Sequence, residues 1–135
     1  EVRRLVAVSR GHHNPALEDL LTVLVEMGDE IVGTIDCSKV GPARSGRFEF
    51  VGSDGQVQGD QVHGTLETVR GMTVSRLRFG GPCNTIIPLL RDWQAFLTGR
   101  GSNPVSGEDG LAAVRLCEAC LESARCGVWV TVRQG

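Results

Sequence analysis

Residues 116–126 read LCEACLESARC, in which a Cys-x-x-Cys pair is followed by a third cysteine six residues later. Thiolates at this spacing are typical zinc ligands, but a structural zinc ion needs four ligands, usually two such pairs or one pair with closely spaced histidines. The chain has one such pair, and of its three histidines His12 and His13 are adjacent while His63 stands alone. The spacing therefore predicts no metal site.

The position of Cys117 and Cys120 also argues against a redox role. Reactive pairs begin a helix, where the backbone dipole lowers the thiol pKa, whereas this pair lies in the middle of a helix predicted over 107–125. Free cysteine otherwise behaves as a small apolar residue and is commonly buried. We interpret the pair as packing residues on an apolar stripe of Leu111, Val114, Cys117, Leu121 and Ala124, with Cys120 beside it.

Four side chains in two loops are candidates for contacting a small polar substrate. His12 and His13 lie in GHHNP (11–15), and Lys39 and Arg44 lie at and after the end of a strand-like run. Loops at strand ends often present ligand-binding groups. We treat these residues as a candidate substrate-side loop, with a simply solvated loop as the alternative that residue types alone leave open.

Catalysis and cofactor binding have no other visible signature in the chain. No Ser/His/Asp or Cys/His arrangement can be placed by spacing. No strand-like run is followed by Gly-x-Gly-x-x-Gly, the fingerprint of a dinucleotide site, and the glycines at 52–55 and 64 mark turns. We therefore predict no catalytic, cofactor-binding or metal-ligating residue in this chain.

Length and composition suit one globular domain. The chain has 135 residues, of which 41% are hydrophobic and 22% charged, with a net charge of −2. It has no basic stripe and few aromatic residues, which argues against a nucleic-acid partner. The longest apolar-rich stretch, 17–27, contains three acidic residues and is too short for a membrane span.

Five cysteines at irregular spacing (37, 83, 117, 120 and 126) do not resemble a disulfide framework. We predict free thiols and a cytoplasmic setting. The chain also begins at Glu1 and passes directly into a strand-like run. We interpret it as a single domain, 1–135, of a longer protein.

The order of predicted elements indicates an α+β fold. Strand-like runs come first, at 2–9, 20–27, 30–39, 47–52, 56–58, 61–70 and 72–79, with tight turns at Gly28-Asp29 and Ser53-Asp54-Gly55. After Gly80-Gly81-Pro82, apolar spacing predicts helices over 86–98 and 107–125, the second opened by a Ser106–Asp109 capping box and closed by Gly127. A last strand is predicted at 128–132. We expect a largely antiparallel open sheet with both helices on one face.

One face of this sheet is expected to be left uncovered. In the run at 30–39, Val32, Thr34 and Asp36 alternate with a more apolar set and should point away from the helices. A sheet with helices on only one face needs water or a partner on the other. These three residues are therefore a candidate interface with a second copy of the chain, in a homodimer or tetramer.

Two stretches together resemble the C-terminal domain of the Gfo/Idh/MocA oxidoreductases. The first, ALEDLLTVLVEMGDEIVGTIDCSKVGPARSGRFEFVGSDGQVQGD (16–60), has the hairpin glycine and the closing G-x-x-G of that family; the second, FLTGRGSNPVSGEDGLAAVRLCEACLESARCGVWVTV (96–132), resembles its ending. The similarity rests on Asp19, Gly28, Gly33, Ser38, Gly52, Gly55, Gly99, Pro104, Ser106, Asp109, Gly110, Ala119, Ser123, Ala124, Gly127 and Val130.

The resemblance implies a function for a larger protein. Members of the family pair an N-terminal Rossmann domain, which binds NAD or NADP, with a C-terminal sheet that covers the substrate and commonly builds the subunit interface. Their substrates are sugars, cyclitols and related polyols. The chain lacks counterparts of the family's dinucleotide fingerprint and Glu-Lys-Pro lysine. The resemblance therefore implies a substrate-pocket wall and interface that is not catalytically competent alone, with the missing Rossmann domain as its partner. The alternative is a stand-alone oligomerising or small-ligand-binding module.

Overall fold

The computed structural model describes residues 1–13, 18–28, 30–79 and 84–133. They divide into two compact units, the first made of Glu1–Pro42 with Asn103–Gly135 and the second of Ala43–Ser102. Several predicted features lie wholly or partly outside the described residues. These are the end of the GHHNP loop, the Gly28-Asp29 turn, the Gly80-Gly81-Pro82 break and Cys83.

The first unit contains a four-stranded antiparallel sheet in the order β3-β2-β1-β8. Its strands are β1 (Val2–Arg10), β2 (Leu20–Met27), β3 (Val32–Ser38) and the short β8 (Val130–Thr131). Successive side chains of a strand point to opposite faces of the sheet, so every second side chain of β1 and β2 lies on the same face. Leu5 and Ala7 of β1 are buried on that face beside Val23 and Val25 of β2.

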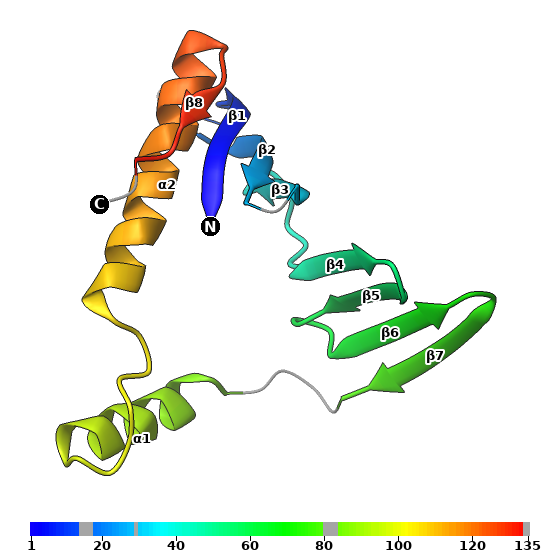
Figure 1. The fold of residues 1–135 in the computed structure, drawn as a ribbon, viewed down its shortest axis with the longest axis vertical. Helices are drawn as coiled ribbons and strands as arrows, with labels where there is room; N and C mark the ends of the chain where they lie inside the picture. The colour runs from blue at the N-terminus through cyan, green and yellow to red at the C-terminus, as the bar shows by residue number, and fades with distance from the viewer. Residues whose placement is uncertain (14–17, 29, 80–83, 134–135) are drawn as a thin grey trace. The chain divides into compact units, whose positions relative to one another are not determined.

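Helix α2 (Gly107–Cys126) covers this face and packs on β1 and β8 (Figure 1). Both ends of α2 are set by the capping residues that the sequence predicted. The hydroxyl of Ser106 accepts from the Asp109 N–H at 3.0 Å, the Asp109 carboxylate accepts from the Ser106 N–H at 3.1 Å, and Gly127 ends the helix at φ 69°. The core consists of Leu5, Ala7, Val23, Val25, Ala119 and Cys120.

The predicted apolar stripe of α2 is wrong in phase. The buried residues are Ala119, Cys120 and Ser123, with Leu116 and Ala124 partly buried, whereas Leu111, Val114, Cys117 and Leu121 are exposed. Small side chains let the helix axis approach the sheet closely, and Ser123 has hydrogen-bond partners there. The larger apolar residues Leu111, Val114 and Leu121 form a second stripe on the helix, and this stripe is exposed in the first unit.

The second unit contains another four-stranded antiparallel sheet, in the order β4-β5-β6-β7. Its members are β4 (Arg47–Gly52), β5 (Gly55–Asp60), β6 (Thr65–Arg70) and β7 (Thr73–Arg78). The same unit includes α1 (Ile86–Leu97), an amphipathic helix with no buried residue. Among the described residues of this unit, Asp60 alone is buried.

The α+β class and the antiparallel strands are confirmed, and the strands form two sheets of four. β3 and β4 are not paired with each other, and the segment that connects them contains Gly41 and Pro42. The expectation that one face of β3 is buried is wrong. Ile35 is 40% exposed because α2 packs on β1 and β8, which leaves β3 beyond its reach.

No helix within the described part of the chain has the length and hydrophobicity needed to cross a membrane.

Candidate functional site

The histidine loop of the first unit is organised by Asp19. The N–H groups of His12 and His13 donate to Asp19 Oδ2 at 2.8 and 2.7 Å, and the Asp19 N–H donates to the Arg10 carbonyl at 3.0 Å. An aspartate that accepts from nearby backbone N–H groups is a common way to hold a turn. The two imidazoles are held close together, with ring centroids 4.9 Å apart.

Lys39 lies at the same end of the sheet, because its N–H donates to the Asp19 carbonyl at 2.8 Å. Three of the four predicted substrate-side residues, His12, His13 and Lys39, are thus brought together around Asp19. Arg44 belongs to the second unit. A role in substrate binding stays a prediction for all four. Asp19 was visible in the sequence only as part of the family resemblance; its position just before β2 was the available signal.

The candidate interface residues lie on the face of the first sheet opposite the core. Val32 pairs with Glu26, Thr34 with Leu24 and Asp36 with Thr22, which places them on the side away from the buried valines of β2. Polar groups on this open face pair with one another. Arg4 Nε donates to Glu26 Oε2 at 2.6 Å, and the Thr22 hydroxyl donates to Asp36 Oδ1 at 2.7 Å.

The salt bridge on this open face also changes the acid–base properties of its members. The hydrogen bond from Arg4 lowers the pKa of the Glu26 carboxyl, and the same contact raises the pKa of the guanidinium. Arg4 additionally lies over the Trp129 ring, 4.7 Å from its centroid. The face therefore combines satisfied polar groups with exposed apolar ones, among them Val8 at 56% and Val32 at 62%.

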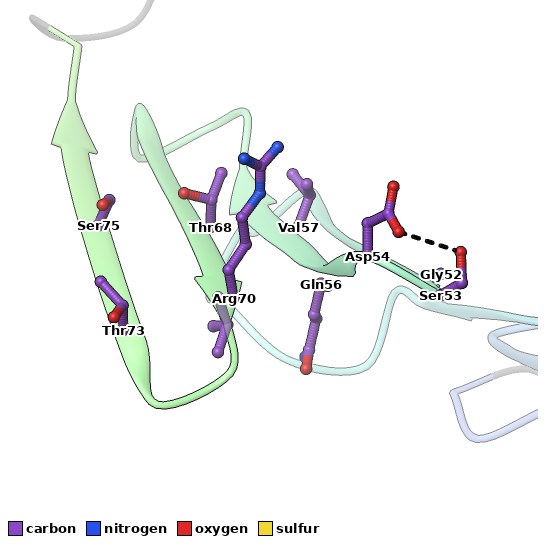
Figure 2. A pocket seen from close by; sticks show the side chains of 11 residues that line it. Gly52, Ser53, Asp54, Gln56, Val57, Thr68, Arg70, Thr73 and Ser75 are labelled. Carbon is purple, nitrogen blue, oxygen red and sulfur yellow. Dashed lines mark hydrogen bonds between the residues drawn. The ribbon is translucent and has the colours of Figure 1, made fainter.

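The second sheet carries an open pocket at one end, with a volume of about 430 Å³ (Figure 2). The turn between β4 and β5 forms one wall, and the adjoining ends of β5, β6 and β7 form the rest. Its lining is rich in hydroxyl groups and includes one guanidinium and one carboxylate. The lining residues are Gly52, Ser53, Asp54, Gly55, Gln56, Val57, Thr68, Val69, Arg70, Thr73 and Ser75.

At the other end of this sheet, Asp60 and His63 form a hydrogen-bonded pair. Asp60 Oδ1 accepts from the N–H groups of Gly46, Val62 and His63 at 3.2, 2.8 and 3.1 Å, and Oδ2 is 2.8 Å from His63 Nδ1. The His63 side chain and these N–H groups hold the pKa of the Asp60 carboxyl far below its usual range, although burial opposes them. Sequence reasoning missed this pair; the signal was an aspartate followed three residues later by histidine and then glycine, a turn-forming pattern.

The cysteines of the described residues are free thiols. Cys120 is buried, whereas Cys37, Cys117 and Cys126 are exposed, so the prediction of a packing role holds for Cys120 and is wrong for Cys117. No group of three or more His, Cys, Asp or Glu side chains within the described ranges could hold a metal ion.

Cys117 and Cys120 should react with an alkylating reagent at different rates. Burial raises the pKa of the Cys120 thiol. The raised pKa and the restricted access of the reagent both slow the reaction of this thiol with iodoacetamide. We expect Cys117 to react at least about tenfold faster than Cys120 in the folded chain, measured by peptide mass spectrometry over time. In denaturant the two rates should converge; equal rates in the folded chain would contradict the burial of Cys120.

Two of three comparisons relate the chain to known proteins. A family model described as "Oxidoreductase family, C-terminal alpha/beta domain" matches residues 1–132. The search of curated protein sequences gave no match. Among solved structures, levoglucosan dehydrogenase in complex with NADH and levoglucosan matches at a TM-score of 0.84 with 17% identity.

Two further structures match comparably well. They are an NAD binding oxidoreductase from Klebsiella pneumoniae, at TM-score 0.82 and 17% identity, and an oxidoreductase from Agrobacterium radiobacter in complex with NAD+, L-tartaric acid and magnesium, at 0.76 and 20%. The matches cover 98–100% of this chain but only 44–46% of those structures. The chain thus spans less than half the length of the proteins whose fold it shares.

Proposed function

The chain belongs to the Gfo/Idh/MocA oxidoreductase family through its C-terminal alpha/beta domain, and on this basis we propose that it is the substrate-side half of an NAD(P)-dependent oxidoreductase. The substrate is a sugar, cyclitol or related polyol. The family match over residues 1–132 carries this proposal. Structural neighbours solved with NADH and levoglucosan, or with NAD+ and L-tartaric acid, support both the cofactor class and the polyhydroxylated substrate class.

The described residues do not fit a dinucleotide cofactor. A Rossmann site needs parallel strands joined by a helix, with a glycine-rich turn at the helix N-terminus. All strand pairs of the described residues are antiparallel, and Gly99 and Gly101 follow a helix rather than a strand. In our proposal the nicotinamide cofactor is held by another domain of the same protein. The loop around Asp19, with His12, His13 and Lys39, lines the substrate side.

The protein that contains this chain should reduce NAD or NADP when supplied with a polyol. The test measures nicotinamide absorbance with a panel of sugars, cyclitols and sugar acids, for the intact protein and for the 135-residue chain alone. Activity of the intact protein with none for the chain supports the proposal. Turnover by the chain alone would overturn the proposal. An intact protein that is inactive with every substrate and both cofactors would also overturn it, and would favour the stand-alone binding module.

The open face of the first sheet is proposed as a contact between two copies of the chain, in a dimer or tetramer. Two features support this. Arg4 and Glu26 form a salt bridge within the face, and Asp36 accepts from the Thr22 hydroxyl, so association need not leave these groups without a partner. Its exposed apolar residues, including Val8, Leu24 and Val32, would be removed from water. A cytoplasmic setting for the assembly agrees with the free thiols.

A charge placed on this face should dissociate the copies. In Val32→Asp a carboxylate opposes Glu26 across the ladder, and burying it in the interface requires desolvation. We expect the dissociation constant of the dimer to rise at least about 100-fold, measured by sedimentation velocity and native mass spectrometry. Val51→Asp, in the second unit and 76% exposed, is the matched control. Equal effects of the two variants, or a wild-type chain that is monomeric, would contradict the interface.

A further inference from the structure

One face of the second sheet changes character along its length. Register places Phe50 opposite Val57, Val57 opposite Thr68, and Thr68 opposite Ser75, so these side chains share a face. We call it the Phe50 face. Toward one end it is apolar, with the Phe48 ring over Gly59, where a Cβ would lie 2.6 Å from the ring. Toward the other end it carries hydroxyls and a guanidinium, and there it forms the pocket of Figure 2.

Several polar side chains on the opposite face of the same sheet bond to one another. Glu67 accepts from Arg76 Nε at 2.8 Å and from Gln58 Nε2 at 2.9 Å, and Gln56 donates to Glu49. These five side chains of that face are therefore occupied by one another. Figure 2 shows Gln56 pointing to that side, away from Arg70 and Val57.

The polar end of the Phe50 face has no such pairing. Among the described residues, the side chains of Thr68, Arg70, Thr73 and Ser75 make no hydrogen bond or ion pair. They are neighbours, because Thr68 pairs with Ser75 and Arg70 with Thr73 across the β6–β7 ladder. Arg4 and Arg76, by contrast, each donate to a carboxylate. One guanidinium and three hydroxyls thus converge on a cavity with their hydrogen-bonding capacity unused.

We propose that this pocket binds a small polyol that carries one anionic group, a carboxylate or a phosphate. The planar fork of Arg70 suits either oxyanion, and the charge-assisted hydrogen bonds would hold it firmly. Thr68, Thr73 and Ser75 can each donate to and accept from ligand hydroxyls. Val57 supplies an apolar floor, as is usual in small-molecule sites. Asp54 at the rim accepts from a further hydroxyl and repels a second anionic group.

The proposal does not rest on the dehydrogenase activity proposed above. It can therefore be tested with the 135-residue chain by itself. Gluconate, glycerol phosphate and neutral sorbitol are titrated separately, and binding is followed by calorimetry and by the Nε–H resonances of arginine in isotope-labelled protein. The variants are Arg70→Gln and Arg70→Lys. Arg78→Gln, in the same sheet on the opposite face, removes the same charge and is the control.

We expect saturable binding of at least one of the two anions, a shift of the Arg70 resonance, and much weaker binding of sorbitol. Arg70→Gln should weaken anion binding about tenfold or more, Arg70→Lys less, and Arg78→Gln little. Binding of only one anion would identify the anionic group. Absence of saturable binding to the wild-type chain, equal affinity for sorbitol, or equal loss in Arg78→Gln would overturn the proposal. Amide spectra of each variant establish that it is folded.

Discussion

Replacing Ser123 by alanine should lower the free energy of unfolding of the first unit by about 2–4 kcal/mol. Ser123 is fully buried in α2, where its hydroxyl accepts from the Ala7 N–H at 2.9 Å and donates to the Val128 carbonyl at 2.6 Å. The substitution leaves the buried Ala7 N–H and the part-buried Val128 carbonyl without this partner. Each unsatisfied group costs about 1–3 kcal/mol, which makes a single oxygen atom unusually important here.

Urea denaturation followed by Trp129 fluorescence measures this effect in the first unit. A Trp93→Phe background removes the tryptophan of the second unit from the signal. Glu122→Ala, the preceding and exposed residue of the same helix, is the control and should change stability by less than about 0.5 kcal/mol. Equal losses for Ser123→Ala and Glu122→Ala would contradict a specific role of the buried hydroxyl, because alanine itself favours the helix.

Replacing Asp60 by alanine should loosen the second sheet at the turn between β5 and β6. Its carboxylate collects three backbone N–H groups and the His63 ring, and it is the buried residue of the described second unit. We expect amide exchange at Gly46, Val62 and His63 to accelerate at least about tenfold, measured by hydrogen–deuterium exchange with NMR. Asp54→Ala, which removes an exposed turn carboxylate, should leave these three amides unchanged. Unchanged protection in Asp60→Ala would contradict this role.

The pH dependence of the same amides follows from the lowered pKa of Asp60, caused first by His63 and then by the backbone donors. A carboxyl whose pKa is lower in the folded state stabilises the fold while it is ionised. Its contribution is complete above the ordinary aspartate pKa of about 3.9 and is lost as the pH falls from there toward the folded value. The protection of these three amides from hydrogen exchange should therefore decline as the pH falls below about 3.9. In Asp60→Asn this decline should be absent.

Local signals in the sequence were sufficient for most elements. The strands at 20–27 and 47–52 agree residue for residue with the structure, and α2 begins and ends at the predicted caps. These features depend on alternation, capping and turn chemistry within a few residues. The predicted phase of α2 is wrong because apolar residues lie on more than one side of the helix, and close approach to β1 selects the small residues Ala119, Cys120 and Ser123. The division of the strands into two sheets depends on long-range pairing, which no local pattern encodes.

The candidate sites also differ in whether they depend on local sequence patterns or on long-range pairing. The histidine loop and the face of Val32, Thr34 and Asp36 could be proposed from the sequence because residue type or alternation marks them, and their roles stay predictions. The Asp60–His63 pair and the pocket around Arg70 were missed. The Asp60–His63 pair forms only when the turn after β5 closes. The pocket forms only when strand pairing brings side chains of separate strands onto one face.

The arrangement of the second sheet has a consequence for handling the isolated chain. Among the described strands, β4 and β7 each have one unpaired side, so β4 offers free N–H and C=O groups along the sequence RFEFVG. Such an edge is a template for strand addition by another molecule, and its two phenylalanines make the segment prone to aggregation. Arg47 and Glu49 interrupt the apolar run and act as gatekeepers. Because their effect is electrostatic, added salt should screen it, and we expect self-association of this chain through β4 to increase with salt concentration.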